Sequence, residues 1–394
     1  MADLKELTKT AELASISERL NIRYGNYSCT LGTEVPDDPP RIPTGIFTFD
    51  FATGGGFPLY QIAQVKGAEH GGKTSLLMSA MSKVPKICWR CFKPLTDCEC
   101  SLPPIKMKSV WCDVEGTFNR FWATCLGCDP SDYYLNISDA GSEYGDIVDY
   151  TLRADDCGLV VVDSIAALLP ADEMDSTLDT RFIGNQSKLI SGFLKKVVSR
   201  LNKEHKRDHP CVVILTNQLR ANIGVMYGPT TMMAGGWAPK YLNGLTINIA
   251  KKAMESDAAK KKFYNKEKDL TLGQKHGFYI EKFKSLKLAE SGSFIRVVAN
   301  APELGYKRGE VVDYKAAIKF LMQTGLMTKS GTGYSFRDSK GTQKDFIAAW
   351  QANPDMYFSV QRQLIDHVKL NVMNFMEEVN LECHDESVDS VEEQ

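Results

Sequence analysis

The chain has 394 residues, of which 43% are hydrophobic and 24% charged, the composition of a soluble globular protein. No apolar run approaches about 20 residues and the first residues include acids, so we predict neither a transmembrane helix nor a secretory signal. The net charge of −2 argues at first against a nucleic-acid partner, and the 11 cysteines favour free thiols in a reducing, cytoplasmic compartment over a disulfide framework.

Residues 1–40 are predicted to form a helix followed by a linker. Apolar residues recur at roughly helical spacing over residues 1–22, and three prolines between 33 and 40 break regular structure. A lone amphipathic helix cannot bury its own apolar stripe, so this one needs the body of the protein or another molecule to cover it.

The segment that follows the predicted strand 61–66 fits the phosphate-loop pattern G-x-x-x-x-G-K-[ST]. Lys73 would reach the β- and γ-phosphates of a nucleoside triphosphate, and the Thr74 hydroxyl would ligate Mg²⁺. The alternative is a glycine-rich turn that merely caps a helix. The residues predicted to bind nucleotide here are Gly67, Ala68, Glu69, His70, Gly71, Gly72, Lys73, Thr74 and Ser75.

Two close cysteine pairs, with the spacing C-x₂-C-x₆-C-x-C, lie in the segment 86–104. Cys88, Cys91, Cys98 and Cys100 could place four thiolates around one Zn²⁺ ion, which would then supply folding energy to a segment too short for its own core. The alternatives are free thiols or a redox pair. A further pair, Cys125 and Cys128, is interpreted as packing residues.

Acidic and amide side chains follow three predicted strands. Asp163 ends the apolar strand 158–163 and is predicted to meet the water shell of the magnesium ion. Glu115 follows strand 108–113, and Gln218 stands at the tip of strand 211–217. Ligands bind at the carboxyl ends of strands in open parallel sheets, so Glu115 is placed to polarise an attacking water. The alternative for Glu115 is a solvated acid at a strand end.

Two long irregular segments, 172–182 and 219–236, are predicted to be functional loops, because long loops without regular structure are uncommon inside compact domains. In the second, Arg220 could contact phosphate, while Ile223 or Met226 could wedge between bases. The alternative is a pair of connectors that bind nothing.

The predicted fold class is α/β, with a mostly parallel twisted sheet covered by helices on both faces. The expected strands are 61–66, 108–113, 158–163, 211–217, 244–250, 276–283 and 293–299, and helices are expected from Gly72, near Thr117 and over 182–204. Residues 41–300 would form this core. Residues 301–372 would form a smaller α/β lobe with helices at 312–325 and 343–370.

The chain ends in an acidic tail, residues 373–394, whose last 18 residues hold eight acids and no Lys or Arg; the rest of the chain has 47 basic and 41 acidic residues. Such a tail can compete with DNA for a basic surface, or it can be a solubilising disordered end.

These motifs together resemble the bacterial RecA-type DNA recombinases, of which the chain looks like a divergent member. The resemblance runs from Arg41 to about Val368 and includes the phosphate loop, Asp113-Val-Glu115, Asp163 with its strand, and the specific run from Asn217 to Gly228 with Gly235-Gly236. It implies a RecA-like ATPase that binds ATP and Mg²⁺. It also implies a cytoplasmic protein, in the host cytoplasm if a phage encodes it.

The resemblance also assigns residue roles. Glu115 becomes the catalytic carboxylate and Gln218 the γ-phosphate sensor, while Lys282 and Lys284 fall where the family reaches the ATP of the adjacent protomer. Residues 1–22 become a helix that docks on the neighbouring subunit. The family contacts the adenine at the positions of Asn119 and Trp122. Segments 173–182 and 219–236 become DNA-binding loops, with Arg181, Arg220, Ile223, Met226, Gly235 and Gly236 as candidate contacts.

The implied function is an ATP-dependent recombinase that assembles with itself on single-stranded DNA and exchanges strands with homologous double-stranded DNA. A hexameric helicase or motor ATPase on the same fold is the alternative, and a weak regulatory scaffold is a third. The sequence departs from the family pattern at His70-Gly71, at Asn119 in place of an acid, at Thr-Met-Met-Ala in 231–234, and in the cysteine insertion.

Overall fold

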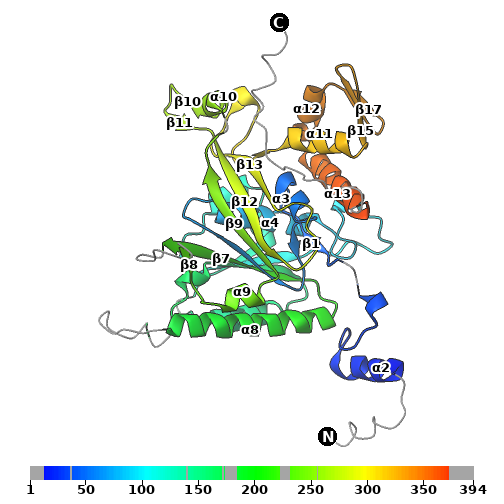
Figure 1. The fold of residues 1–394 in the computed structure, drawn as a ribbon, viewed down its shortest axis with the longest axis vertical. Helices are drawn as coiled ribbons and strands as arrows, with labels where there is room; N and C mark the ends of the chain where they lie inside the picture. Colours follow the sequence, from blue (N-terminus) through cyan, green and yellow to red (C-terminus); the bar gives the residue numbers. More distant parts are fainter. Residues whose placement is uncertain are drawn as a thin grey trace, which may run out of the picture.

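The computed structural model describes residues 13–35, 38–138, 141–170, 173, 184–221, 231–254 and 256–371. Its centre is a sheet with the strand order β14-β13-β12-β9-β3-β7-β6-β4-β5 (Figure 1). The strands from β9 to β5 run parallel, whereas β12, β13 and β14 continue the sheet in antiparallel pairs. The bounds are β3 Ile62–Gly67, β4 Lys108–Asp113, β5 Tyr133–Asn136, β6 Cys157–Asp163, β7 Val212–Ala221, β9 Leu245–Lys252, β12 Gly273–Phe283, β13 Ser291–Val297 and β14 Val311–Val312.

Both faces of the parallel strands are buried, as an all-apolar strand requires. Along β6, Leu159 and Val161 join one apolar cluster, while Val160 and Val162 join a second on the opposite face. The helices α6 (Tyr144–Thr151) and α8 (Asn185–Lys206) contribute to the second cluster. The helices α3 (Phe47–Ala52) and α4 (Lys73–Met81) contribute to the first. The α/β class is therefore confirmed, and α8 lies along one side of the molecule in Figure 1.

A smaller lobe follows the sheet, built from α11 (Tyr314–Gln323), three short strands, α12 (Gln343–Ala352) and α13 (Pro354–Leu370). The strands are β15 Met327–Ser330, β16 Gly333–Phe336 and β17 Ser339–Gly341. Apolar residues of the lobe belong to the same cluster as α3 and α4, so the two parts share one core. The main sheet also takes in β14, which lies past residue 300.

The single helix expected over 343–370 is wrong, because two helices occupy this range. The chain breaks at Asn353, whose side chain accepts a hydrogen bond from the Met356 amide at 3.1 Å. Pro354 takes the first position of α13, where a missing N–H costs nothing. The helix expected near Thr117 begins later, as α5 (Arg120–Cys125).

Strand β7 is longer than expected and corrects two predictions. It continues to Ala221, and its residues 219–221 pair antiparallel with β8 (Thr231–Met233). Gln218 therefore lies within the strand and not at its tip. Segment 219–236 contains both arms of a hairpin, with residues 219–221 as the first arm and 231–233 as the second. Arg181, Ile223 and Met226 lie outside the described residues.

The N-terminal helix α2 (Leu13–Tyr24) stands apart from the body in Figure 1 and has no buried residue. The segment after it returns to the core, where the ring of His205 stacks between Tyr27 and Tyr60 at centroid distances of 4.6 and 4.1 Å. The smaller elements are β1 Arg41–Ile42, β2 Phe57–Pro58, α9 Ala238–Leu242, α10 Asp257–Lys262, β10 Tyr264–Asn265 and β11 Leu270–Thr271. Within the described ranges, no helix combines the length and apolar character needed to cross a bilayer.

Candidate nucleotide site

The phosphate loop connects the end of β3 to the start of α4. Gly67 approaches the neighbouring strand so closely that a Cβ there would lie 2.0 Å from the carbonyl oxygen of Ile249. Gly72 precedes the helix with a φ of 98°, in the left-handed region that glycine adopts without strain. These requirements place the first-turn amides of α4 at the carboxyl edge of the sheet, where a helix N-terminus attracts phosphate.

The side chains of Lys73 and Thr74 form hydrogen bonds with other residues of the site. The Lys73 ammonium donates to the carbonyl oxygens of Gly67 at 3.0 Å and Ala68 at 2.8 Å, and burial lowers its pKa. The Thr74 hydroxyl donates to Asp163 at 2.9 Å, and Thr216 donates to the other carboxylate oxygen. Burial raises the pKa of Asp163. A hydroxyl beside a carboxylate is a set of hard oxygen donors that suits Mg²⁺, so the residues present fit the ion.

Glu115 and Gln218 meet at the same edge. The Gln218 amide nitrogen donates to Glu115 Oε1 at 3.0 Å, and the Ser164 hydroxyl donates to the same oxygen. Glu115 is exposed just beyond β4, while Asp113 turns to accept from the amides of Thr117 and Phe118. Strands β4, β6 and β7 thus deliver an acid, a hydroxyl and an amide to one point, as their parallel order predicts.

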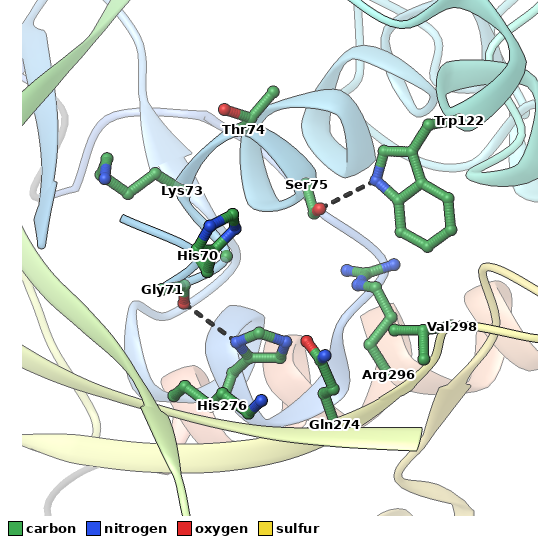
Figure 2. A pocket seen from close by; sticks show the side chains of 12 residues that line it. His70, Gly71, Lys73, Thr74, Ser75, Trp122, Gln274, His276, Arg296 and Val298 are labelled. Carbon is green, nitrogen blue, oxygen red and sulfur yellow. Dashed lines mark hydrogen bonds between the residues drawn. The ribbon is translucent and has the colours of Figure 1, made fainter. Parts of the chain in front are cut away.

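A pocket of about 500 Å³ opens beside the loop (Figure 2). Trp122 forms part of its wall, and the indole N–H donates to the Ser75 hydroxyl at 2.9 Å. Asn119 is not among the lining residues; its side chain caps α5 by accepting from the Trp122 amide at 2.9 Å. Residues 70–75 supply another wall, and Lys251, Gln274, His276, Arg296 and Val298 complete the lining.

Two buried residues of this pocket, His276 and Arg296, were not predicted from the sequence. The His276 Nδ1–H donates to the Gly71 carbonyl at 2.9 Å, and burial lowers the pKa of His276 to about 4, so the imidazole is neutral near pH 7. Burial likewise lowers the pKa of Arg296 to about 10, and its guanidinium donates to Ser79 and Gly309. The available signal was that Arg296 is the one charged residue of the predicted strand 293–299.

Lys282 and Lys284 lie at the opposite edge of the sheet from the phosphate loop. Phe283 pairs with Leu245, which in turn pairs with Ala63 near the start of β3. The Lys282 ammonium donates to the carbonyl oxygens of Lys240 and Tyr241 at 2.6 and 3.2 Å, whereas Lys284 is exposed. Neither lysine adjoins the nucleotide pocket of its own chain.

Comparison with known proteins shows the family to which a chain with this site belongs. The model of the RecA N-terminal domain matches residues 11–275, more than half of the chain. This chain belongs to the RecA family. It is 27% identical over 369 residues to the mitochondrial DNA repair protein recA homolog of Dictyostelium discoideum, covering 92% of this chain and 70% of that protein. It is 28% identical to protein RecA of Fusobacterium nucleatum, covering 85% of this chain and 78% of the relative.

The identity to protein RecA of Thermotoga neapolitana is 31% over 248 residues, which are 62% of this chain and 64% of that one. Membership in the RecA family agrees with the sheet and loop described above and confirms the resemblance found in the sequence. The named relatives come from cellular organisms and give no support to a phage origin.

The cysteine insertion of this RecA-family chain brings its four thiols together. The Sγ atoms of Cys88, Cys91, Cys98 and Cys100 all lie within 4.8 Å of one another, with Cys88 and Cys100 4.0 Å apart and Cys91 and Cys98 3.8 Å apart. A tetrahedron with Zn–S bonds of about 2.3 Å has S···S edges of about 3.8 Å. The cluster therefore fits a zinc ion. Burial opposes the Cys88 thiolate, but backbone amides overcome this and lower the pKa of Cys88 to about 6.

The second cysteine pair has no such arrangement. Cys128 is buried and its thiol donates to the Met78 carbonyl at 3.2 Å, while Cys125 is half-buried. The cysteines that the structure describes are all free, in agreement with the expected reduced thiols.

Proposed function

We propose that this RecA-family chain is an ATP-dependent DNA recombinase, which polymerises on single-stranded DNA and exchanges strands with homologous double-stranded DNA. The observation that carries the proposal is the hydrogen bond between Glu115 and Gln218. Gln218 lies on β7 only three residues before this strand ends at Ala221, where segment 222–230 begins. The Gln218 side chain therefore touches the candidate catalytic acid, and its backbone directly precedes the arm of the candidate DNA loop.

In the proposed ATPase reaction, Lys73 turns from the loop carbonyls toward the β- and γ-phosphates, and the amides of residues 67–75 hold the triphosphate. Thr74 and Asp163 would hold Mg²⁺, which when bound neutralises charge on the phosphates. Glu115 orients and polarises the attacking water. A γ-phosphate competes with Glu115 for the Gln218 amide, so nucleotide occupancy changes the position of Gln218 and with it the hairpin β7–β8.

The base would lie against Trp122, since an indole can stack on any base. Asn119 supports this wall through its cap on α5 and need not contact the base itself. Because the side-chain oxygen of Asn119 already accepts the capping hydrogen bond, an acid is not required at this position to cap α5.

Lys282 and Lys284 are proposed to act on the nucleotide of the adjacent protomer. Their edge of the sheet faces away from the phosphate loop, so they can only meet a triphosphate that another chain holds. A positive charge supplied in trans makes hydrolysis depend on assembly, in the way an arginine finger does. The uncovered helix α2 is proposed to dock on a neighbouring subunit in the same polymer, which would bury exposed residues such as Leu13 and Ile22.

DNA is proposed to bind along segments 173–182 and 219–236. Within the described part, the Asn217 side chain donates to the Ala234 carbonyl at 3.1 Å, which joins the residue just before the second segment to a residue near its end. Gly235 and Gly236 follow with φ values of 94° and 60°, which let the chain turn into α9. Arg181, Arg220, Ile223 and Met226 remain candidate contacts, with phosphate contacts weakening steeply as salt rises.

Electron microscopy with single-stranded DNA tests the proposal directly. A helical fibre that requires a non-hydrolysable ATP analogue and Mg²⁺ is the expected result, whereas a closed ring would favour the helicase or motor alternative. Equal affinity for an oligonucleotide with and without Mg²⁺-nucleotide, measured by fluorescence anisotropy, would contradict the proposed coupling. We also propose a cytoplasmic location, consistent with free thiols.

We further propose that the cysteine cluster holds a structural Zn²⁺ ion. The cluster supplies four sulfur donors and leaves no open position, which is typical of a structural rather than a catalytic zinc site. Metal analysis of purified protein should find about one equivalent per chain, and less than about half an equivalent would contradict the assignment.

A further inference from the structure

The cysteine knuckle, residues 86–104, lies against helix α13 of the C-terminal lobe. Asp97 accepts hydrogen bonds from the Ser359 hydroxyl at 2.5 Å and from the Gln363 amide at 3.4 Å. Beside this pair, Lys86 forms an ion pair with Asp355 at 3.2 Å. The knuckle therefore contacts, at two places, a helix more than 200 residues away in the sequence.

The contacted residues form one face of the helix. Asp355, Ser359 and Gln363 follow one another at intervals of four, the spacing of side chains stacked along one side of an α-helix. The Lys83 ammonium lies 4.9 Å from the ring centroid of Phe358, which adjoins this row. The knuckle and the residues just before it thus cover a continuous stripe of α13.

Another face of α13 contacts the core. The Arg362 guanidinium donates to the Gly55 carbonyl at 3.0 Å, and the Tyr357 hydroxyl donates to Asp313 at 2.8 Å. Leu364 and Val360 are buried in the shared apolar cluster. The helix is consequently held between the ATPase core on one side and the knuckle on the other.

The inner part of the knuckle is anchored without metal. Trp89 is buried, its indole N–H donates to the Val84 carbonyl at 2.8 Å, and its ring fills the space left by Gly158 at the start of β6. A Cβ on Gly158 would lie 2.4 Å from that ring. This half of the segment has enough packing to keep its position on the sheet.

The outer part has much less support from packing. Asp97 ends a single 3-10 turn, Leu95–Asp97, between the two cysteine pairs and directly precedes Cys98. Its neighbours Thr96 and Glu99 are exposed. The chain is held up to the start of this turn by the backbone bridge between Ile87 and the buried Pro94. After the turn, the approach of Cys98 and Cys100 to Cys91 and Cys88 ties it to the anchored half.

We infer that the metal of the cysteine cluster is a clasp for the C-terminal lobe: by joining the outer cysteines to the inner ones, it holds Asp97 against α13 and so reinforces the shared core that keeps the lobe on the ATPase domain. This inference rests on the proposed zinc site but not on the proposed recombinase activity. Because Lys83 follows α4 closely, the clasp also places the lobe next to the helix that begins at the phosphate loop.

Hydrogen–deuterium exchange of the full-length protein, with zinc content measured on each sample, tests the inference. Removal of zinc by a chelator should accelerate amide exchange in α13 by about tenfold, the loss expected for hydrogen bonds to a charged group. Helix α8, on the opposite face of the sheet, should be unchanged. Equal acceleration in α8 would show that the metal supports the whole fold, and would overturn the clasp.

Asp97→Ala separates the clasp from metal binding, because it leaves the four thiols intact. This variant should keep its zinc and still show faster exchange in α13. Glu99→Ala is the matched control: Glu99 lies two residues after Asp97, is exposed, and pairs only with Lys93 at 3.5 Å within the described structure, so α13 should exchange as in the wild type. If the purified wild type carries zinc but α13 exchanges at an unchanged rate both after chelation and in Asp97→Ala, the clasp alone is overturned. Wild-type protein without zinc would overturn the metal site and the clasp together.

Discussion

The proposed dependence of hydrolysis on Lys282 and Lys284 of a neighbouring chain can be tested by mixing two inactive variants. Phe283 lies level with Ala63, four residues before the end of β3 at Gly67, and two strands across the sheet. Four residues of strand span about 13 Å and two strand spacings about 10 Å, so the lysines start about 16 Å from the phosphate loop of their own chain. A lysine side chain cannot cover that distance.

Each variant alone should be nearly inactive. Glu115→Gln removes the proposed base but keeps the lysines, and the double change Lys282→Ala, Lys284→Ala removes the lysines but keeps the base. The loss from the second should be on the order of 10³ in DNA-stimulated turnover, as for other charges supplied in trans. Nucleotide binding to the free protein should change little in either variant.

A 1:1 mixture of the two should recover activity. In a head-to-tail polymer about a quarter of the interfaces pair an intact site from one variant with intact lysines from the other, so turnover should reach about a quarter of the wild-type value. The assay is phosphate release in the presence of single-stranded DNA at saturating protein. A mixture of Glu115→Gln with Lys73→Ala is the control, because both changes damage the site itself and no pairing repairs it.

Turnover of the mixture no greater than the mean of its components would refute the trans assignment. Lys282→Ala also removes the hydrogen bonds to the last residues of α9, so Lys284→Ala alone is the cleaner half of the test. It should show the same complementation, with a smaller initial loss.

Three further changes test the nucleotide site. Gly67→Ala would place a Cβ 2.0 Å from the Ile249 carbonyl oxygen and should lower stability by about 1–3 kcal/mol in urea unfolding, whereas Gly192→Ala, in open space on α8, should not. Trp122→Ala should weaken ATP binding by about 1–3 kcal/mol in titration calorimetry, and Trp122→Phe by less. Burial lowers the pKa of His276 from 6.5 to about 4, so native protein binds fewer protons than unfolded protein between these values. The wild type should lose up to about 3 kcal/mol of unfolding free energy as pH falls from 6.5 to 4, and His276→Gln should lose less in urea titrations at both pH values.

The phosphate-loop residues and the parallel strands could be predicted because their signals are local. The run from Gly67 to Thr74 carries its own geometry, and β4 has the predicted bounds of 108 and 113. The direction of parallel strands then places Glu115 and Asp163 at one edge. No knowledge of distant contacts was needed for these predictions.

Side-chain contacts that depend on the register between distant strands could not be predicted from the sequence. His276 meets Gly71 only because β12 pairs with β9 in one register, and a slip of one residue would turn His276 to the other face. The break before Pro354 is different, since a proline within a predicted helix is itself a signal for a new helix start. That error came from reading the apolar period across the proline.

The positions of the two half-sites also constrain how the chain can assemble. A dimer with two-fold symmetry must present one surface patch to the same patch of its partner. The phosphate loop and Lys284 lie at opposite edges of one sheet. A two-fold contact that joined them would complete both half-sites of the pair and leave none free for a third chain. A head-to-tail contact joins the carboxyl edge of one sheet to the lysine edge of the next once per interface. Such a contact leaves one free half-site at each end, and growth continues from both until a ring closes or DNA ends. The exposed helix α2, which the body of its own chain leaves uncovered, adds a second contact that can set the rotation between successive copies and so decide between ring and helical polymer.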